Sequence, residues 1–139
     1  MTGLRLYLDT NAIIGMVERA GEMSVGQRTL VLGIADGELE AETSELTLAE
    51  SLVKPMADRD AELAERYFRV LAPQSGIEVR EVSREVLILA ARIRAEKRVK
   101  LPDAIHLATA QATGCDRFVS NDGGLAKAWP KEFMRWGEL

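Results

Sequence analysis

Hydrophobic and polar residues follow two different periods along the chain, and these periods predict strands separated by helices. Leu4, Leu6 and Leu8 occupy every second position, a spacing typical of a strand. Further strands are predicted at 40–44, 77–82, 117–120 and 133–136. Helices are predicted at 12–20, 25–35, 47–54, 61–71, 84–97, 103–112 and in a short segment ending near 129. Strands that alternate with helices imply right-handed crossovers and a mainly parallel sheet covered on both faces. The predicted fold class is therefore a three-layer α/β/α sandwich.

Two prolines are expected to separate helices. Pro55 should end the helix 47–54, because the residue before a proline resists the helical conformation. Leu101-Pro102 should break the chain before the helix 103–112, and Gly114 should cap that helix at its end. Its residues are almost uniformly apolar, so we expect this helix to be buried.

The composition is typical of a globular protein. The 139 residues are enough for one domain with its own core and too few for two ordinary domains. The longest uncharged runs are shorter than a membrane span, and the N-terminus lacks the pattern of a signal peptide. We therefore expect a cytoplasmic protein with no membrane partner. Cys115 is the only cysteine, which excludes an internal disulfide and a thiolate metal cluster.

Four acidic residues lie beside predicted element boundaries. They are Asp9, Glu50, Asp103 and Asp122. Asp9 and Asp122 each follow a predicted strand, and ligands of parallel sheets bind beyond the carboxyl ends of the strands. Glu50 and Asp103 lie near helix N-termini, which can face the same edge. The four carboxylates could therefore meet in a divalent-metal site.

Each of these acids also has an ordinary structural explanation. Asp9 could cap the first helix, and Asp103 could complement a helix dipole. Glu50 ends a capping-box pattern that begins three residues earlier, and it could pair with Lys54 one turn later. Asp122 precedes two glycines and could be a turn residue. Only the joint arrangement of the four favours a functional site.

The net charge of −4 does not decide whether nucleic acid is a partner. Phosphate binding depends on Lys and Arg, but acids gathered around a metal lower the net charge while a separate basic strip can hold phosphates. One candidate strip consists of Arg92, Arg94, Lys97, Arg98 and Lys100. It could steer a substrate, or it could be a solvated helix face whose basic end complements the helix dipole. His106, one turn after Asp103, could touch the acidic pocket or be an ordinary hydrogen-bonded histidine.

Four segments occur in an order that is similar to the motifs of a known family. They are Leu8-Asp9-Thr10-Asn11, Leu48-Ala49-Glu50, Leu101-Pro102-Asp103-Ala104-Ile105-His106-Leu107-Ala108-Thr109-Ala110 and Val119-Ser120-Asn121-Asp122. With these segments the chain resembles PIN-domain ribonucleases over essentially its whole length, and most closely the VapC-type toxins of toxin–antitoxin pairs. Two departures from the family pattern occur. Ser120 stands where the family often has Thr, and Gly123-Gly124-Leu125 stands where a more polar stretch leads to an aromatic residue.

The resemblance implies a single PIN-like domain, residues 1–139, with a metal-dependent endoribonuclease activity. Its metal ligands would be Asp9, Glu50 and Asp103, with Asp122 as the fourth acid. Mg²⁺ and Mn²⁺ prefer such hard oxygen ligands. Asn11 and Ser120 would orient the acids or the phosphate of RNA. The alternative is a PIN-like module that binds RNA or a protein without cutting it, and metal-dependent cleavage separates the two.

The resemblance also implies protein partners. A small antitoxin would place a basic side chain, often Arg, in the acidic pocket, where it would neutralise the carboxylates and block metal or substrate. VapC-type proteins commonly form homodimers, so a homodimer is expected here. The apolar helix 25–35 is a candidate contact between the two copies. Core packing explains the same apolar residues at least as well.

Overall fold

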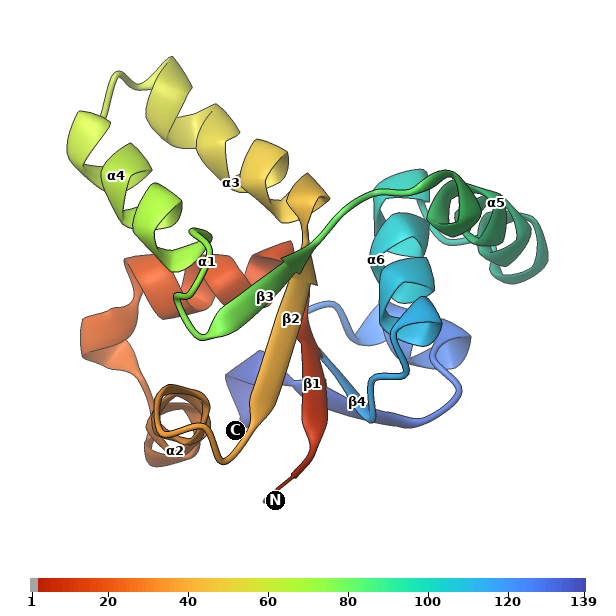
Figure 1. Ribbon diagram of the computed structural model, residues 1–139, viewed down its shortest axis with the longest axis horizontal. Coiled ribbons are helices and arrows are strands. Elements are labelled where there is room, and N and C mark those ends of the chain that lie inside the picture. Colours follow the sequence, from red (N-terminus) through yellow and green to blue (C-terminus); the bar gives the residue numbers. More distant parts are fainter. Residues whose placement is uncertain (1–2) are drawn as a thin grey trace.

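Five parallel strands form the central sheet of the protein. The computed structural model describes residues 3–139. Its strands are β1 (Arg5–Leu8), β2 (Glu40–Ser44), β3 (Ile77–Arg80), β4 (Arg117–Ser120) and β5 (Glu132–Arg135). They lie side by side in the order β3-β2-β1-β4-β5, so β1 is central and all the carboxyl ends share one edge (Figure 1).

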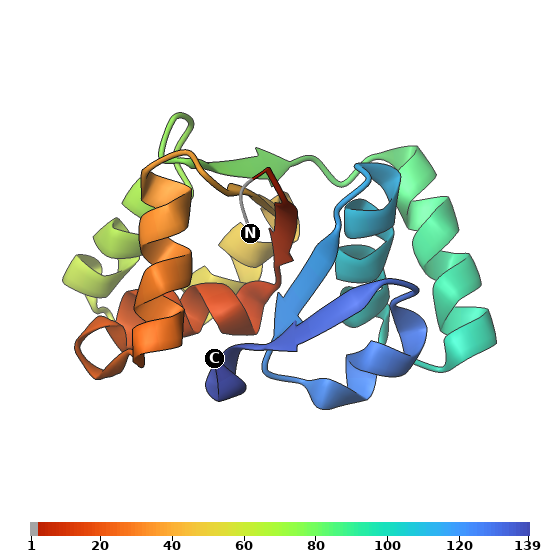
Figure 2. The ribbon, with the colours of Figure 1, turned by 90° about the horizontal axis from the view of Figure 1, so that it is seen from below.

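Helices cover both faces of this sheet. The α-helices are α1 (Thr10–Glu18), α2 (Val25–Ala35), α3 (Glu45–Ala57), α4 (Ala61–Val70), α5 (Arg84–Lys97) and α6 (Leu101–Ala112). Short 3-10 helices are η1 (Ala20–Glu22), η2 (Gly123–Ala128) and η3 (Trp136–Glu138). Figures 1 and 2 show α1 to α4 on one face and α5, α6 and η2 on the other. The predicted three-layer α/β/α sandwich with a parallel sheet is thus confirmed.

Alternate residues of β1 supply the two halves of the core. Leu6 and Leu8 pack into the cluster formed by α1 to α4, whereas Tyr7 packs into the cluster formed by α5, α6 and η2. All three side chains are fully buried. A strand covered on both faces buries both sets of alternating residues, which explains why Tyr7 is a core residue despite its hydroxyl group.

Two predicted helix boundaries are wrong. Pro55 lies inside α3, which continues to Ala57, and Leu101-Pro102 forms the first turn of α6 instead of a break before it. A proline in the first turn loses no intrahelical hydrogen bond, since the first backbone N–H groups of a helix have no partner within it. Pro55 lies near the other end of its helix, so the helix loses a single hydrogen bond and ends within one turn.

The start of α3 also differs from the prediction. The helix begins at Glu45 because the Ser44 hydroxyl accepts the Leu46 N–H at 3.0 Å. Glu50 therefore lies in the second turn and is not part of a capping box. Within the described residues, none of the helices has the length and apolar character needed to cross a bilayer.

Candidate functional site

The edge of the sheet where β1 and β4 end is the point at which the chain changes faces. Crossovers from β1 through β3 use one face, and the crossover that leads to β4 uses the other. A crevice outside the carboxyl ends of the strands is expected at such a switch point. Asp9 follows β1 and Asp122 lies just beyond β4, and the Asp9 N–H donates to the Val119 carbonyl at 3.2 Å. The two neighbouring strands thus bring both acids to the same edge.

Asp9 is buried at this edge, with 3% of its surface exposed. Its Oδ1 accepts the Ala12 N–H at 3.0 Å, so Asp9 is the N-cap of α1, and it also takes part in a hydrogen bond with the Ser120 side chain. Burial raises the pKa of Asp9, and the nearby Asp103 raises it further, while the Ser120 and Ala12 hydrogen bonds oppose the change. Asp9 therefore caps α1 and also interacts with another of the four predicted acids, Asp103.

Asp103 interacts electrostatically with each of the other three acids. It lies half-buried in the first turn of α6. Its pKa is raised first by burial and then by the negative charges of Asp122 and Glu50, while His106 and Lys100 lower it. Because Asp9 also interacts with Asp103, each of the other three predicted acids lies within electrostatic range of Asp103.

Glu50 is held by two hydrogen bonds to the same oxygen. The Thr10 hydroxyl donates to Oε1 at 2.7 Å, and His106 Nε2 lies 2.8 Å from it. The His106 hydrogen bond is the main reason that the pKa of Glu50 is lowered. Within residues 3–139, Glu50 Oε2 makes no hydrogen bond, so that oxygen remains available to a ligand. Lys54 pairs with Glu18 and not with Glu50.

A chain of buried donors fixes the orientation of His106. Burial raises the pKa of Tyr7 well above its ordinary value, so its hydroxyl keeps its proton and can donate to His106 Nδ1, 2.6 Å away. Nε2 then carries the imidazole proton and donates to Glu50. Behind Tyr7, Thr43 hydrogen-bonds to the tyrosine, and its Oγ1 lies 2.7 Å from that of Thr47. The chain of hydrogen bonds ends on Glu50, which is thereby kept ionised and in place.

The sequence contains little signal for this chain. Tyr7 and Thr43 belong to neighbouring strands and Thr47 to the helix after the second, so only the sheet register and the helix packing bring them together. His106 was open to two interpretations, a hydrogen-bonded buried histidine or a residue of the pocket. Both describe it: the residue is 2% exposed and contacts Glu50.

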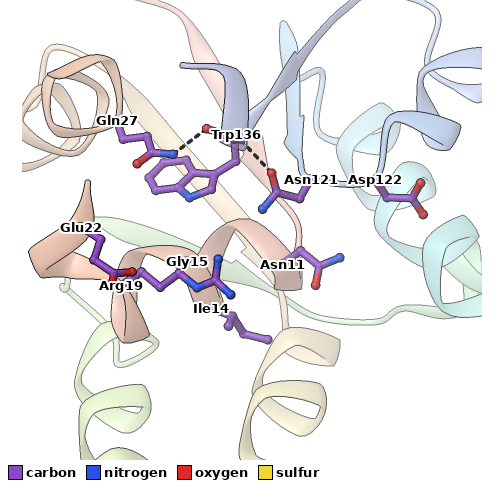
Figure 3. Close-up of a pocket in the computed structure, with 10 residues that line it drawn as sticks. Asn11, Ile14, Gly15, Arg19, Glu22, Gln27, Asn121, Asp122 and Trp136 are labelled. Atoms are coloured by element: carbon purple, nitrogen blue, oxygen red, sulfur yellow. Dashed lines mark hydrogen bonds between the residues drawn. The ribbon is translucent and has the colours of Figure 1, made fainter. Parts of the chain in front are cut away.

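Asp122 and the two supporting polar residues lie on the outer side of the site. Asp122 is exposed, and its Oδ1 accepts the Gly124 N–H at 2.9 Å, so it is also the turn residue that its sequence suggested. The fully buried Ser120 hydroxyl accepts the Asp122 N–H at 2.9 Å and links Asp122 to Asp9. Asn11 is exposed and, with Asp122, lines a pocket beside the acids (Figure 3).

The acids are near one another but not gathered tightly. Among residues 3–139, no three His, Cys, Asp or Glu side chains lie close enough together to form a ready metal site. The donor set nevertheless suits a hard cation. Mg²⁺ usually keeps several waters and needs only one or two carboxylates from the protein. The raised pKa values of Asp9 and Asp103 reflect burial together with negative charge that a hydrated cation would offset. The residues therefore fit a hydrated divalent ion better than a closed cage of protein ligands.

The basic strip Arg92–Lys100 is exposed at its five basic positions. Arg94 donates to the Val99 carbonyl at 3.0 Å, and Arg94 and Lys97 occupy the last turn of α5, where they complement the helix dipole. Lys100 is the residue before α6 and lowers the pKa of Asp103. The dipole role is consistent with this geometry, and a role in steering substrate stays a prediction.

The sequence from residue 6 to residue 128 matches the family model described as PIN domain. The chain belongs to the PIN domain family. This match spans every predicted site residue. Among curated proteins, none matches this chain.

Solved structures with the same fold cover nearly the whole of this PIN domain. VapBC2 from Rickettsia felis, bound to a DNA fragment from its promoter, gives a TM-score of 0.75 at 16% identity over 96% of this chain and 99% of that one. FitAcB from Neisseria gonorrhoeae gives 0.70 at 16% identity, with the same two coverages. DNA-bound VapBC from Salmonella typhimurium gives 0.67 at 21% identity over 96% and 98% of the two chains. At these identities the likeness establishes the fold alone.

Proposed function

We propose that this PIN domain is a metal-dependent endoribonuclease and the toxin of a toxin–antitoxin pair. The observation that carries the proposal is the environment of Asp103, whose carboxylate lies within range of three other acids at the switch point of the sheet. An ordinary surface would disperse these charges. Membership of the PIN domain family and the fold shared with VapBC structures support the same function.

In the proposed reaction, a bound Mg²⁺ or Mn²⁺ would make water a better nucleophile and would neutralise charge on the phosphate. Asp9, Glu50 and Asp103 would hold the ion, and Asp122 would contribute directly or through water. Ser120 would hold Asp9 and the backbone of Asp122 in fixed positions relative to each other through its two hydrogen bonds. Asn11, which makes no side-chain hydrogen bond within residues 3–139, would orient the phosphate.

Glu50 has the most constrained role in this scheme. One of its oxygens is occupied by Thr10 and His106, so only Oε2 is available to the ion or to its waters. A carboxylate that is itself hydrogen-bonded by neighbouring residues is typical of metal sites in proteins. The hydrogen bonds keep Glu50 charged and limit its rotation, and both effects favour cation binding.

The test is cleavage by the purified protein, free of any partner, of a mixture of structured cellular RNAs in Mg²⁺ or Mn²⁺. The controls are EDTA and the Asp103→Asn variant. Discrete cuts that disappear in both controls are expected. If the RNA stays intact in all metals while the protein still binds RNA or a co-purifying protein, the domain is the non-catalytic binding module.

We also propose a small antitoxin as partner, since the solved relatives include VapBC complexes and a toxin-antitoxin complex from Klebsiella pneumoniae. The four acids would give a basic side chain of such a partner carboxylates with which to pair. Co-expression with a cognate antitoxin should suppress cleavage. The proposed location of this pair is the cytoplasm.

A homodimer through α2 is the last part of the proposal. Leu30 and Ile34 of this helix pack in the core and Val31 packs against it, so core packing explains three of its five large apolar side chains. Val25 and Leu32 point away from the core and are 83% and 61% exposed. These two side chains are the candidate contact with a second copy.

A further inference from the structure

A pocket of about 630 Å³ opens directly beside the acidic centre. Asn11 and Asp122 belong both to its wall and to the candidate site, so the two spaces are continuous. Figure 3 shows the pocket between α1 and the C-terminal segment that carries Trp136. Its volume lies in the range of pockets that hold small organic ligands.

The walls of the pocket are fixed by packing and hydrogen bonds. Trp136 is buried against α1 at Gly15, where an added Cβ would lie 2.5 Å from the indole Nε1. Gln27 Nε2 donates to the Trp136 carbonyl at 2.7 Å, and Asn121 Oδ1 accepts the Gly137 N–H at 2.7 Å (Figure 3). The bond to Gly137 uses the amide oxygen of Asn121. The two amide hydrogens of Asn121 have no partner among residues 3–139.

Arg19 is the one cationic side chain among the residues that line this pocket. It is exposed at the end of α1, and its guanidinium group forms neither an ion pair nor a hydrogen bond within residues 3–139. Figure 3 shows the side chain running along the pocket towards Ile14, with the Trp136 ring across from it. The Trp136 Nε1–H likewise has no hydrogen-bond partner in the described part of the chain.

The free polar groups of the pocket include both donors and acceptors. Arg19 and Asn121 would donate, Asn11 carries donors and an acceptor, and the carboxylates of Asp122 and Glu22 are acceptors. A ligand that carries phosphate and carbonyl oxygens would pair with the donors, and guanidinium groups bind phosphate through two parallel hydrogen bonds. A nucleotide has this chemistry, and a continuous RNA strand would pass from the pocket to the acids.

We propose that this pocket binds the nucleotide next to the scissile phosphate of RNA, with Arg19 on the phosphate of that nucleotide. This inference takes RNA as the ligand from the proposed nuclease function. It does not require the protein to cleave the RNA. Arg19 would then lower KM without touching the reacting atoms. A residue that binds ground state and transition state equally affects KM and leaves kcat unchanged.

The experiment compares Arg19→Ala with a matched control, Arg28→Ala. Arg28 is an exposed arginine of α2 outside the pocket, and its removal changes the net charge equally. The Arg19 backbone N–H caps α1 through the Gly15 carbonyl, and alanine keeps that bond. Binding of a fluorescein-labelled, random-sequence octaribonucleotide is measured in an Asp103→Asn background, which keeps the RNA intact. Cleavage of the RNA found in the nuclease assay supplies KM and kcat.

Arg19→Ala should weaken octamer binding and raise KM by about tenfold or more, because hydrogen bonds to charged groups are the stronger ones. Its kcat should stay within about threefold of the wild-type value, and Arg28→Ala should match the wild type in both assays. Equal effects of the two substitutions, or none, would overturn the subsite.

The two proposals fail in distinguishable ways. Cleavage without any specific effect of Arg19 would reject the subsite and keep the nuclease. Octamer binding that depends on Arg19, without cleavage by the wild type, would reject the nuclease and keep the subsite. A protein that neither binds nor cuts RNA would contradict both.

Discussion

His106 Nε2 lies 2.8 Å from Glu50 Oε1, and this contact joins the second turn of α3 to the first half of α6 across the carboxyl edge of the sheet. The histidine is buried, whereas about a third of the Glu50 side chain is exposed. A buried donor thus holds one oxygen of a carboxylate whose other oxygen makes no hydrogen bond within residues 3–139. Hydrogen bonds that position a carboxylate in this way are typical of residues around a metal site, where they orient the metal ligands.

Tyr7→Phe should weaken divalent-metal binding while the fold is retained. The substitution removes the hydroxyl that donates to His106 Nδ1, so the imidazole loses the bond that fixes its orientation towards Glu50. Loss of such an outer partner typically costs about 10–100-fold in metal affinity. Calorimetric titration with Mn²⁺ measures the effect. The buried nitrogen left without a donor should also lower stability by about 1–3 kcal/mol.

Tyr67→Phe is the matched control for that loss of stability. Tyr67 is also fully buried and its hydroxyl is also a hydrogen-bond donor, but its acceptor is the Glu18 carboxylate, on the opposite side of the sheet from His106. The Tyr67→Phe variant should be less stable than the wild type but should bind Mn²⁺ with unchanged affinity. Equal Mn²⁺ affinities in the two variants would show that the Tyr7 chain does not position Glu50.

Asp103→Asn should stabilise the metal-free protein and abolish cleavage. The pKa of Asp103 is raised by burial and by neighbouring acids, so its charged form is less stable in the folded protein than in the unfolded chain. A neutral amide removes that penalty. We expect a rise of a few degrees in Tm at neutral pH in EDTA, measured by calorimetry. Glu38→Gln, an exposed carboxylate in the turn before β2, should leave both Tm and activity unchanged.

The raised pKa of Asp103 also predicts how the gain in Tm of the Asp103→Asn variant varies with pH. A carboxyl group with a raised folded pKa holds its proton longer in the folded state than in the unfolded one. Its favourable contribution is therefore full below the unfolded pKa and is lost as pH rises through the folded pKa. The Tm difference between Asp103→Asn and wild type should consequently grow from acid to neutral pH. A difference that is constant or shrinks over this interval would contradict the assignment.

The edge occupied by the acids could be predicted because it follows from topology, but the contacts within it could not. Asp9 and Asp122 each follow a strand, and parallel strands place their carboxyl ends together whatever the side chains are. The Glu50–His106 contact depends on how α3 and α6 cross that edge, which no local pattern determines. The separation of the acids depends on the same packing. The assignment of the acids as ligands, and of residues 1–139 to one domain, stays a prediction.

Local rules failed where a neighbouring residue changed their outcome. The proline rule placed the end of a helix at Pro55, but a proline this close to a C-terminus costs only one hydrogen bond, and α3 continues past it. The capping-box pattern ending at Glu50 was pre-empted by Ser44, which caps the helix one turn earlier. The helix 25–35 was predicted with its observed bounds.

Leu32→Glu should shift a homodimer towards monomer. Leu32 is 61% exposed on α2, on the side of the helix away from the core residue Leu30. A charge buried in an apolar contact without a partner is strongly unfavourable. Sedimentation velocity over a range of concentrations measures the change. Ile88→Glu on α5, which is 55% exposed on the other face of the molecule, should leave the association unaffected. Wild-type protein that stays monomeric at high concentration would exclude the dimer.

Gly15→Ala should destabilise the protein although alanine is the better helix former. Replacing glycine in a helix interior normally gains about 1 kcal/mol. Here the new Cβ would lie 2.5 Å from Trp136 Nε1 and 3.0 Å from Cδ1, so the buried indole would have to move. Overpacking of a core costs about 1–3 kcal/mol, which offsets or exceeds the gain. Urea unfolding followed by fluorescence gives the free energy of unfolding.

Gly21→Ala separates this clash from the general effect of the substitution, because an added Cβ there meets nothing within 4 Å. It should be neutral or slightly stabilising. Since Gly15 and Trp136 also line the pocket that holds Arg19, the displaced indole should raise KM for RNA in Gly15→Ala alone. A Gly15→Ala protein that is more stable than wild type would show that Trp136 moves aside at little cost. The pocket wall would then be too mobile to position a nucleotide.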